Sequence, residues 1–352
     1  MQFYADKRVF ITGHTGFKGS WLSLWLAQAG ARVIGYSRPP EETPDSLFTL
    51  TSLAGRMTSH YGDVGNFSEL SHVLKEARPD VVFHMAAQSL VLPSYESPVE
   101  TFATNVMGTV HVLEAVRKAG GVKAVVNVTT DKCYENNETA IAFREDDKLG
   151  GYDPYSSSKA AAEIVSAGYR HSFLTSEHIP MATVRAGNVI GGGDFSRHRL
   201  IPDIIRAAQS KVPVNLRHPE SIRPWQYVLD VLHGYLLVGK ALYEQGESYA
   251  QAYNFGPDES NVTVGVVADQ LVKAMQNPVT ITHGKTDTSH EAHLLKLNNI
   301  KAKTVLGWRP RLSTHDAIET TAKWYGHYLA HPQSITEFTL EQLTAYRTGI
   351  PA

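Results

Sequence analysis

A phenol and an ammonium group stand four residues apart in this chain, at Tyr155 and Lys159. In a helix this spacing places both side chains on one face. A cation beside a phenol lowers its pKa, so the pair predicts a tyrosine that can act as a base near neutral pH. The bare pattern is expected by chance roughly once in a chain of this length, so its surroundings must support the interpretation.

Hydroxyl and charged residues lie just ahead of that helix, where the predicted strand 123–129 ends. Thr129 and Thr130 occupy the carboxyl end of the strand, the edge at which parallel sheets bind ligands. A hydroxyl there can share a proton with Tyr155 over a substrate alcohol. Asp131 and Lys132 follow directly, and by themselves they could equally be a loop or cap carboxylate and a solvated charge.

A glycine-rich turn, Thr12-Gly-His-Thr-Gly-Phe-Lys-Gly19, connects the predicted strand 8–12 with the predicted helix 16–29. Glycine allows the backbone to turn sharply and to approach a pyrophosphate, whose charge is met by the helix N-terminus. The spacing is one residue looser than the standard fingerprint, but its place after the first strand of a βα series favours a dinucleotide over an ordinary turn. We expect the cofactor to contact Gly13, Gly16, Phe17 and Gly19.

The end of the second predicted strand, 31–36, bears on the choice between NAD and NADP. NAD sites usually have an acidic residue there, whereas this chain has Tyr36, Ser37 and Arg38. An arginine can accommodate the 2′-phosphate of NADP, so these residues alone lean towards NADP. Asp63, after the third predicted strand 57–61, is placed to bind adenine or to cap the helix that begins at Asn66.

The elements that must position these residues alternate between β-branched runs and amphipathic stretches, which is typical of βαβ units. Two more strands, at 80–84 and 180–185, bring the predicted sheet to six. Helices are predicted at 66–76, 99–119, 155–173, 202–209, 229–243, 264–275, 314–328 and 334–346. We therefore expect an α/β fold, with a Rossmann doubly wound parallel sheet over residues 1–187 and a smaller α/β substrate lobe, interleaved with it, over residues 188–352.

Composition excludes several classes of protein. The 352 residues carry a net charge of −2 and are 19% charged, so we expect no nucleic-acid partner. No segment reaches the roughly 18 apolar residues that span a bilayer, so we expect no membrane partner. A lone cysteine, Cys133, and a polar start without a signal peptide predict a cytoplasmic protein.

Taken together, the motifs resemble those of the extended short-chain dehydrogenase/reductases that act on nucleotide sugars. The shared motifs are the glycine turn, His84–Gln88, Asn105, Thr129–Thr130, Tyr155 with Lys159, Arg185–Asn188, Arg223–Val228, Tyr253–Pro257 and Leu306–Trp308. The resemblance implies that the cofactor is also held by Tyr36, Ser37, Arg38, Asp63, Val64, Ala86, Ala87, Gln88, Asn105, Thr129, Tyr155, Lys159 and Arg185.

Within that family, Thr130-Asp131 resembles the nucleotide-sugar 4,6-dehydratases, in which the aspartate protonates the departing 6-hydroxyl. Most of these continue with glutamate, the presumed base at C5. Lys132 in its place, with Gly35-Tyr-Ser37, resembles the branch that acts on CDP-glucose. That branch uses NAD, and this implication outweighs the preference for NADP drawn from the residues alone. The role of Arg38 is then left unexplained. The alternatives are a 4,6-dehydratase of another nucleotide sugar, or a 4-epimerase.

The resemblance also implies roles for the central residues. Tyr155 would deprotonate the sugar 4-hydroxyl, with Lys159 holding the phenolate and the ribose, and Asp131 would be the acid at C6. The tightly bound NAD would be regenerated in each turnover. Lys132 could be the C5 base if burial lowered its pKa from about 10.4 to about 7; otherwise it would stay charged and stabilise the C4 enolate.

The resemblance places the substrate only loosely. Gln88, Ser89 and Thr130 would face the sugar. Asn188, Arg197, Arg217 and Arg223 would bind the diphosphate, although Arg197 could instead form a surface ion pair. His290-x-x-His293 with Glu291 lacks a third ligand, so we expect no metal. Relatives of this kind are homodimers or homotetramers that pair through helices like 99–119 and 155–173.

Overall fold

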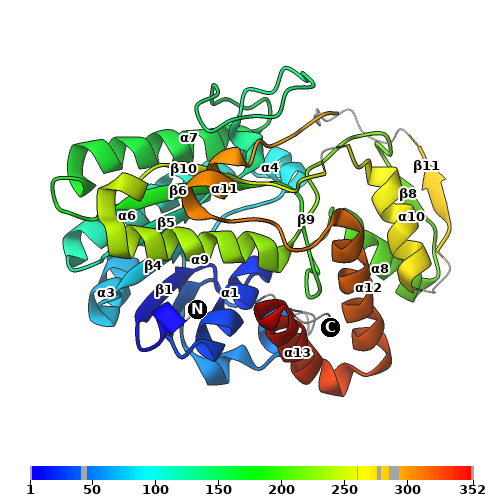
Figure 1. Ribbon diagram of the computed structural model, residues 1–352, viewed down its shortest axis with the longest axis horizontal. Helices are drawn as coiled ribbons and strands as arrows, with labels where there is room; N and C mark the ends of the chain where they lie inside the picture. The colour runs from blue at the N-terminus through cyan, green and yellow to red at the C-terminus, as the bar shows by residue number, and fades with distance from the viewer. Residues whose placement is uncertain (1, 41–45, 260, 276–278, 285–292, 350–352) are drawn as a thin grey trace.

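The computed structural model describes residues 2–40, 46–259, 261–275, 279–284 and 293–349. At its centre lies a parallel sheet of seven strands in the order β10-β6-β5-β4-β1-β2-β3 (Figure 1). They are β1 Arg8–Thr12, β2 Arg32–Ser37, β3 Thr58–Tyr61, β4 Val81–His84, β5 Ala124–Val128, β6 Met181–Ala186 and β10 Ala252–Phe255. The strand order reverses between β1 and β4, the point at which Rossmann sheets bind dinucleotides. The predicted doubly wound Rossmann fold is confirmed.

Side chains along β1 alternate between the two faces of the sheet. Val9 and Ile11 belong to one core cluster and Phe10 to another. The first cluster includes side chains of α1 Phe17–Gln28 and α9 Val228–Gln245, and the second includes those of α3 Phe67–Ala77 and α6 Gly108–Ala119. Because helices cover both faces, β4 and β5 are buried along their whole length, which explains their nearly continuous apolar runs.

Two predicted helices contain a π turn. The helix predicted over 99–119 is α5 Pro98–Phe102, a π turn at Ala103–Met107, and α6. The helix predicted over 155–173 is α7 Pro154–Tyr169 with a π turn at Arg170–Leu174. Such turns are frequent at functional sites, and the first of them carries Asn105.

The prediction of a six-stranded sheet is wrong, because β10 adds a seventh strand beside β6. The run Ala252-Tyr-Asn-Phe255 is short and contains no β-branched residue, and its strand signal comes only from its two aromatic residues. Tertiary contacts make this run a strand: Asn254 pairs with Arg185 of β6, and Tyr253 and Phe255 are fully buried in the core. The second half of the chain therefore adds a strand, β10, to the central sheet, and a helix, α9, to the core on one face of that sheet.

Two small sheets lie outside the central one. β8 Val214–Leu216 pairs with β11 Ile281–His283, and β7 Val189–Ile190 with β9 Gln226–Tyr227. Figure 1 shows β8 and β11 at one side of the molecule with two helices. The helices of the second half are α8 Leu200–Ser210, α10 Val264–Met275, α11 Ile300–Leu306, α12 Thr314–Ala330 and α13 Ile335–Thr348. The division into lobes at residue 187 stays a prediction.

The predicted terminal helix is α13, and it packs against the core. Its Tyr346 donates a hydrogen bond to Asp230 Oδ1 at 2.6 Å and lies edge-on to Trp25. Shorter turns are α2 Leu47–Leu50, α4 Val91–Glu96, and the 3-10 turns Gln2–Tyr4, Leu53–Arg56, Asp131–Cys133, Gly246–Tyr249 and Pro332–Ser334. None of the described helices has both the length and the apolar character needed to cross a membrane.

Candidate active site

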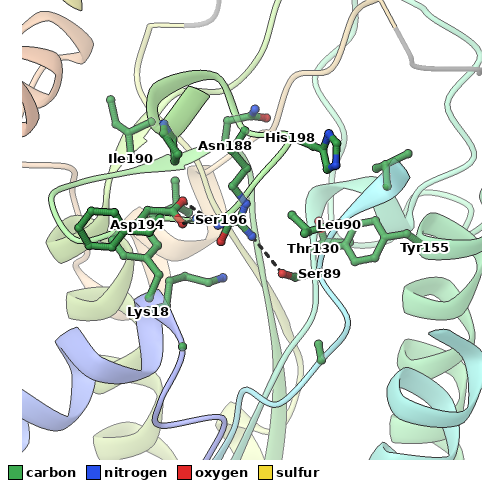
Figure 2. A pocket seen from close by; sticks show the side chains of 18 of the residues that line it. Lys18, Ser89, Leu90, Thr130, Tyr155, Asn188, Ile190, Asp194, Ser196 and His198 are labelled. Carbon is green, nitrogen blue, oxygen red and sulfur yellow. Dashed lines mark hydrogen bonds and ion pairs between the residues drawn. The ribbon is translucent and has the colours of Figure 1, made fainter. Parts of the chain in front are cut away.

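A cavity of about 980 Å³ opens over the carboxyl ends of the central strands. Its wall is formed by the loops that follow β1, β2, β4, β5 and β6, and by β8 with the residues after it. Figure 2 shows Thr130 and Tyr155 on one side of the cavity and Lys18 and Asp194 on the other. Residues from the central sheet and from the second half of the chain therefore share one site.

The glycine turn forms a close-fitting cradle at one end of this cavity. Gly13 has a φ of +77°, and a Cβ there would lie 2.7 Å from the backbone nitrogen of Ala86. A Cβ on Gly19 would lie 2.0 Å from the Gly13 carbonyl oxygen. Gly16 caps α1 without any side-chain hydrogen bond, so the first N–H groups of the helix are left for an anion. These features fit a dinucleotide pyrophosphate.

The residues predicted at the adenosine end do not all line the cavity. Ser37, Arg38, Asp63 and Val64 line the cavity. Tyr36 does not: it is buried, and its hydroxyl donates to the Asp63 carbonyl at 3.2 Å. Asp63 is not the cap of α3, because Asn66 accepts the hydrogen bond from the N–H of Glu69.

The loop after β4 is braced by two residues that we predicted at the cofactor. Ala86, Ala87 and Ser89 line the cavity, but Gln88 and Asn105 do not. The Gln88 amide accepts from Leu90 N at 2.6 Å and donates to Leu90 O at 3.0 Å. Asn105 accepts from Gln88 N at 2.9 Å and donates to its carbonyl oxygen, also at 2.9 Å. Both amides therefore hold the loop in shape, and Gln88 does not face the sugar.

The structure does not bring Arg185 to the cofactor. Its guanidinium makes two 2.9 Å hydrogen bonds to the Glu163 carboxylate and one of 2.7 Å to the hydroxyl of Tyr134. Burial acts to raise the pKa of Glu163, but the hydrogen bonds from Arg185 hold it below the usual value. A buried arginine needs such a partner. Thr129 lines the cavity, yet its hydroxyl also donates to Glu163.

The proposed catalytic residues meet where β5 ends and α7 begins. Asp153 caps α7 by accepting from Ser156 N at 2.9 Å, and Pro154 occupies the first turn. This cap places Tyr155 at the start of the helix, with Lys159 one turn later. Thr130, Asp131, Lys132, Tyr155 and Lys159 all line the cavity, as predicted.

Asp131 is placed to hold a proton. It is 2% exposed, and its Oδ2 has no hydrogen-bond partner among the described residues. Burial raises the pKa of this carboxyl, although Lys132 and a hydrogen bond from Thr130 oppose the shift. A carboxyl with a raised pKa and one free buried oxygen suits a general acid.

Tyr155 and Lys159 differ from the expectation in one respect. Burial raises the pKa of Tyr155 to about 12, and the neighbouring Thr130 hydroxyl is the largest influence that lowers it. The charge of Arg199 adds to this lowering. Burial lowers the pKa of Lys159 to about 8, and its ammonium donates to the Val128 carbonyl at 3.1 Å. Further positive charge at the site would be needed to make Tyr155 a base near neutral pH.

Lys18 is a cavity residue that the sequence analysis missed. Burial lowers the pKa of this lysine to about 7, and the nearby cations Arg199 and Lys159 contribute. Its ammonium lies 5.8 Å from the centre of the Tyr235 ring. One signal was available: a lysine in the first turn of a helix opposes the positive end of the helix dipole, so it calls for a specific reason.

The predicted diphosphate residues separate into two groups. Asn188, Arg217 and Arg223 line the cavity, whereas Arg197 is exposed and outside it. Arg199 lies where Arg197 was expected: its guanidinium donates to Ser89 Oγ at 3.0 Å and pairs with Asp194 at 2.9 Å. The sequence shows both arginines in one loop, and only the fold selects between them.

The structure tests the metal prediction only in part. His290 and Glu291 lie outside the described residues, so the structure says nothing of their arrangement with His293. Within the described ranges, no group of three potential ligands could hold a metal ion.

Comparisons with known proteins agree with this geometry. Residues 10–321 match the family described as GDP-mannose 4,6 dehydratase. The chain is 48% identical over 329 residues to the CDP-glucose 4,6-dehydratase of Salmonella typhimurium, covering 92% of this chain and 91% of the relative. It is 27% identical to a dTDP-glucose 4,6-dehydratase of Xanthomonas campestris, covering 90% and 92%.

Solved structures of low sequence identity share the fold. The UDP-glucose 4-epimerase of Thermotoga maritima, solved with UDP-glucose, is 21% identical with a TM-score of 0.80, covering 91% of this chain and 99% of that one. The dTDP-glucose 4,6-dehydratase of Bacillus anthracis, solved with NAD, is 24% identical with a TM-score of 0.74, covering 90% and 96%.

Proposed function

The chain belongs to the GDP-mannose 4,6 dehydratase family, and from that premise we propose that it removes water from CDP-glucose to form CDP-4-dehydro-6-deoxy-D-glucose. The identity of 48% to a CDP-glucose 4,6-dehydratase over 92% of the chain supports this substrate. It is an NAD-dependent hydro-lyase whose reaction leaves no net oxidation. Its product class suggests a role in the synthesis of deoxysugars for surface polysaccharides.

One observation favours a dehydratase over an epimerase: the buried carboxyl of Asp131 lies in the same cavity as Tyr155. A 4-epimerase shares the first oxidation at C4 but needs no acid for a leaving group at C6. Burial raises the pKa of Asp131, which favours a carboxyl that can donate a proton. The free Oδ2 of Asp131 is the atom that we assign to this donation.

The glycine cradle and the open N-terminus of α1 support NAD as the cofactor. When bound, NAD accepts the hydride from C4 and returns it to C6. We propose that Gly13, Gly16, Phe17 and Gly19 contact the pyrophosphate, and that Ser37 and Asp63 contact the adenosine. Gly13 and Gly19 leave no room for a side chain beside this path.

The first step is oxidation at C4. Tyr155 Oη takes the proton of the 4-hydroxyl as the C4 hydride departs. The raised pKa of Tyr155 means that the protein alone keeps this phenol neutral. The positive ring of the oxidised cofactor would supply charge that favours the phenolate. We assign Lys159, one turn later on α7, to hold the phenolate and the cofactor ribose.

The second step is elimination of water. The 4-ketone makes the hydrogen at C5 acidic, and its proton passes to a base. Asp131 Oδ2 gives its proton to the 6-hydroxyl, which leaves as water. Hydride at C6 and a proton at C5 then complete the product. Tyr155 then carries one proton more than at the start and Asp131 one proton fewer. Transfer of that proton from Tyr155 to Asp131 restores the starting state.

Lys132 is the candidate base at C5. It lines the cavity and also a small adjoining pocket with Tyr134 and Asp153. Its side chain is only half-buried. A lysine must lose its charge to act as a base. The charged form, which stabilises the enolate at C4, is the competing role for Lys132.

We also propose a homodimer or homotetramer that pairs through α5, α6 and α7. Apolar side chains are exposed on α5 and α7: Val99 is 83% exposed, Phe102 39% and Ile164 62%. Exposed apolar groups that cluster on neighbouring helices are typical of an interface. We propose a cytoplasmic location on the ground that Cys133 is a lone, buried thiol.

The test is incubation of the protein with the CDP, dTDP, UDP and GDP forms of glucose, and of mannose where available. We expect CDP-glucose to be turned over in preference to the other nucleotide sugars, with the product detected by the absorbance of a 4-keto-6-deoxy sugar in alkali. Formation of an epimerised hexose without a stable ketone would contradict the dehydratase proposal. Turnover of another nucleotide sugar in preference would contradict only the choice of cytidine.

A further inference from the structure

Arg38 occupies the position where NADP-binding proteins often place a cation, yet the proposed cofactor is NAD. It directly follows β2, lines the cavity and is 60% exposed. The Thr15 hydroxyl donates to the Arg38 carbonyl at 3.1 Å and lies 2.9 Å from Ser37 Oγ. The backbone at the end of β2 is therefore held in place, at the part of a Rossmann site that meets the adenosine ribose.

The guanidinium of Arg38 has a carboxylate partner. Its Nη1 donates to Glu100 Oε1 at 3.0 Å. Glu100 belongs to the first turn of α5, where the helix dipole favours a negative charge. The residue comes from a different βα unit, 62 positions away in the chain, so no local sequence pattern joins the two.

We propose that Glu100 determines cofactor specificity: by pairing with Arg38 it cancels a cation that would otherwise bind the 2′-phosphate of NADP. This inference rests on the proposed use of NAD. A 2′-phosphate carries up to two negative charges, and it would have to displace or approach the Glu100 carboxylate. The 2′-hydroxyl of NAD is uncharged and meets no such repulsion.

The geometry also explains why Arg38 alone gave a misleading signal in the sequence. An unpaired arginine after the second strand favours NADP, whereas an arginine already bound to a carboxylate offers a phosphate little net attraction. Both side chains are exposed, so the pair itself adds little to stability. Its effect should therefore appear in ligand selectivity and not in folding.

The experiment measures binding of NAD and NADP to the cofactor-free protein by titration calorimetry at low ionic strength. In Glu100→Gln we expect NADP to bind about tenfold more tightly than in the wild type, with NAD binding within about twofold of the wild type. The gain should disappear in the double variant Arg38→Ala/Glu100→Gln, and it should shrink as salt is added.

Glu96→Gln is the matched control. Glu96 is an exposed glutamate in the neighbouring helix α4, so this substitution removes the same charge. An equal gain in this variant would show a general charge effect and overturn the proposal. So would an unchanged NADP affinity in Glu100→Gln. A wild-type protein that binds NADP and not NAD would instead contradict the proposed cofactor, so the two failures are distinguishable.

Discussion

The hydroxyl of Thr130 donates a hydrogen bond to Asp131 Oδ1 at 3.0 Å. The same hydroxyl is also the largest influence that lowers the pKa of Tyr155. Thr130 therefore links the residue that gains a proton in the proposed first step with the residue that loses one in the second. Asp131 Oδ2, the other oxygen of that carboxyl, stays free for the substrate.

Replacement of Thr130 by valine should lower kcat by about 100-fold, the scale of positioned acid–base groups. Without the hydroxyl, the pKa of Tyr155 should rise further, so the alkaline shift of the pH profile is the specific readout. Thr130→Ser keeps the hydroxyl and should retain most activity. Equal losses in the serine and valine variants, with no change in pH dependence, would argue for a packing defect instead.

Asp131→Asn removes the proposed acid at C6 and keeps the size of the side chain. Product formation should fall by about 100-fold or more, while oxidation at C4 should still occur. A transient rise in the absorbance of reduced nicotinamide, measured by stopped flow, would report that step. The dehydratase assignment of Asp131 fails if the asparagine variant forms product at the wild-type rate.

Lys132→Glu distinguishes a base from a charge that stabilises the enolate. A glutamate can also take the C5 proton, so deuterium exchange at C5 should persist with the pH optimum moved to lower pH, because a carboxyl titrates below a lysine. The exchange is followed by NMR in deuterated water. An unchanged pH dependence would count against Lys132 as the base and in favour of Tyr155 or water.

Lys18→Met should alter how stability depends on pH. The pKa of Lys18 is about 7 in the folded protein, below its ordinary value of 10.5. Between about pH 7 and 10.5 the unfolded chain therefore binds one proton more than the folded protein. The resulting loss of stability in the wild type reaches its full size below pH 7. The methionine variant should be more stable than the wild type near pH 7, with the difference vanishing towards pH 10.

The measurement is the urea midpoint of the cofactor-free protein across this range. Lys159, whose pKa is also lowered, is present in both proteins and cancels in the comparison. A difference between the two midpoints that does not vary with pH would mean that Lys18 stays charged in the folded protein.

Ile164→Asp tests the proposed interface. Ile164 is 62% exposed on α7, and a carboxylate there should oppose close packing of a second copy. Light scattering after gel filtration should show a shift to monomer. Ile141→Asp is the control, since Ile141 is 74% exposed outside the described helices and strands of the central layer. Identical oligomers in both variants would exclude this face of α7 as the interface.

The sequence by itself determined the parts of this protein that depend on neighbouring residues. The alternation of β-branched runs and amphipathic stretches predicted six of the seven central strands. The signal is strongest for β4 and β5, because parallel strands buried on both faces need unbroken apolar runs. The glycine turn and the spacing of Tyr155 and Lys159 are likewise local. They need only a strand, a turn and a helix of the right length.

Tertiary structure decided every feature that joins distant segments. It paired β10 with β6, turned Arg185 to Glu163 in place of the cofactor, and chose Arg199 over Arg197 for the cavity. In the two arginine cases the side-chain type was the same, and only the partner differed. A guanidinium takes its role from the carboxylate or phosphate within hydrogen-bond reach, and that distance is set by the fold and not by the spacing along the chain.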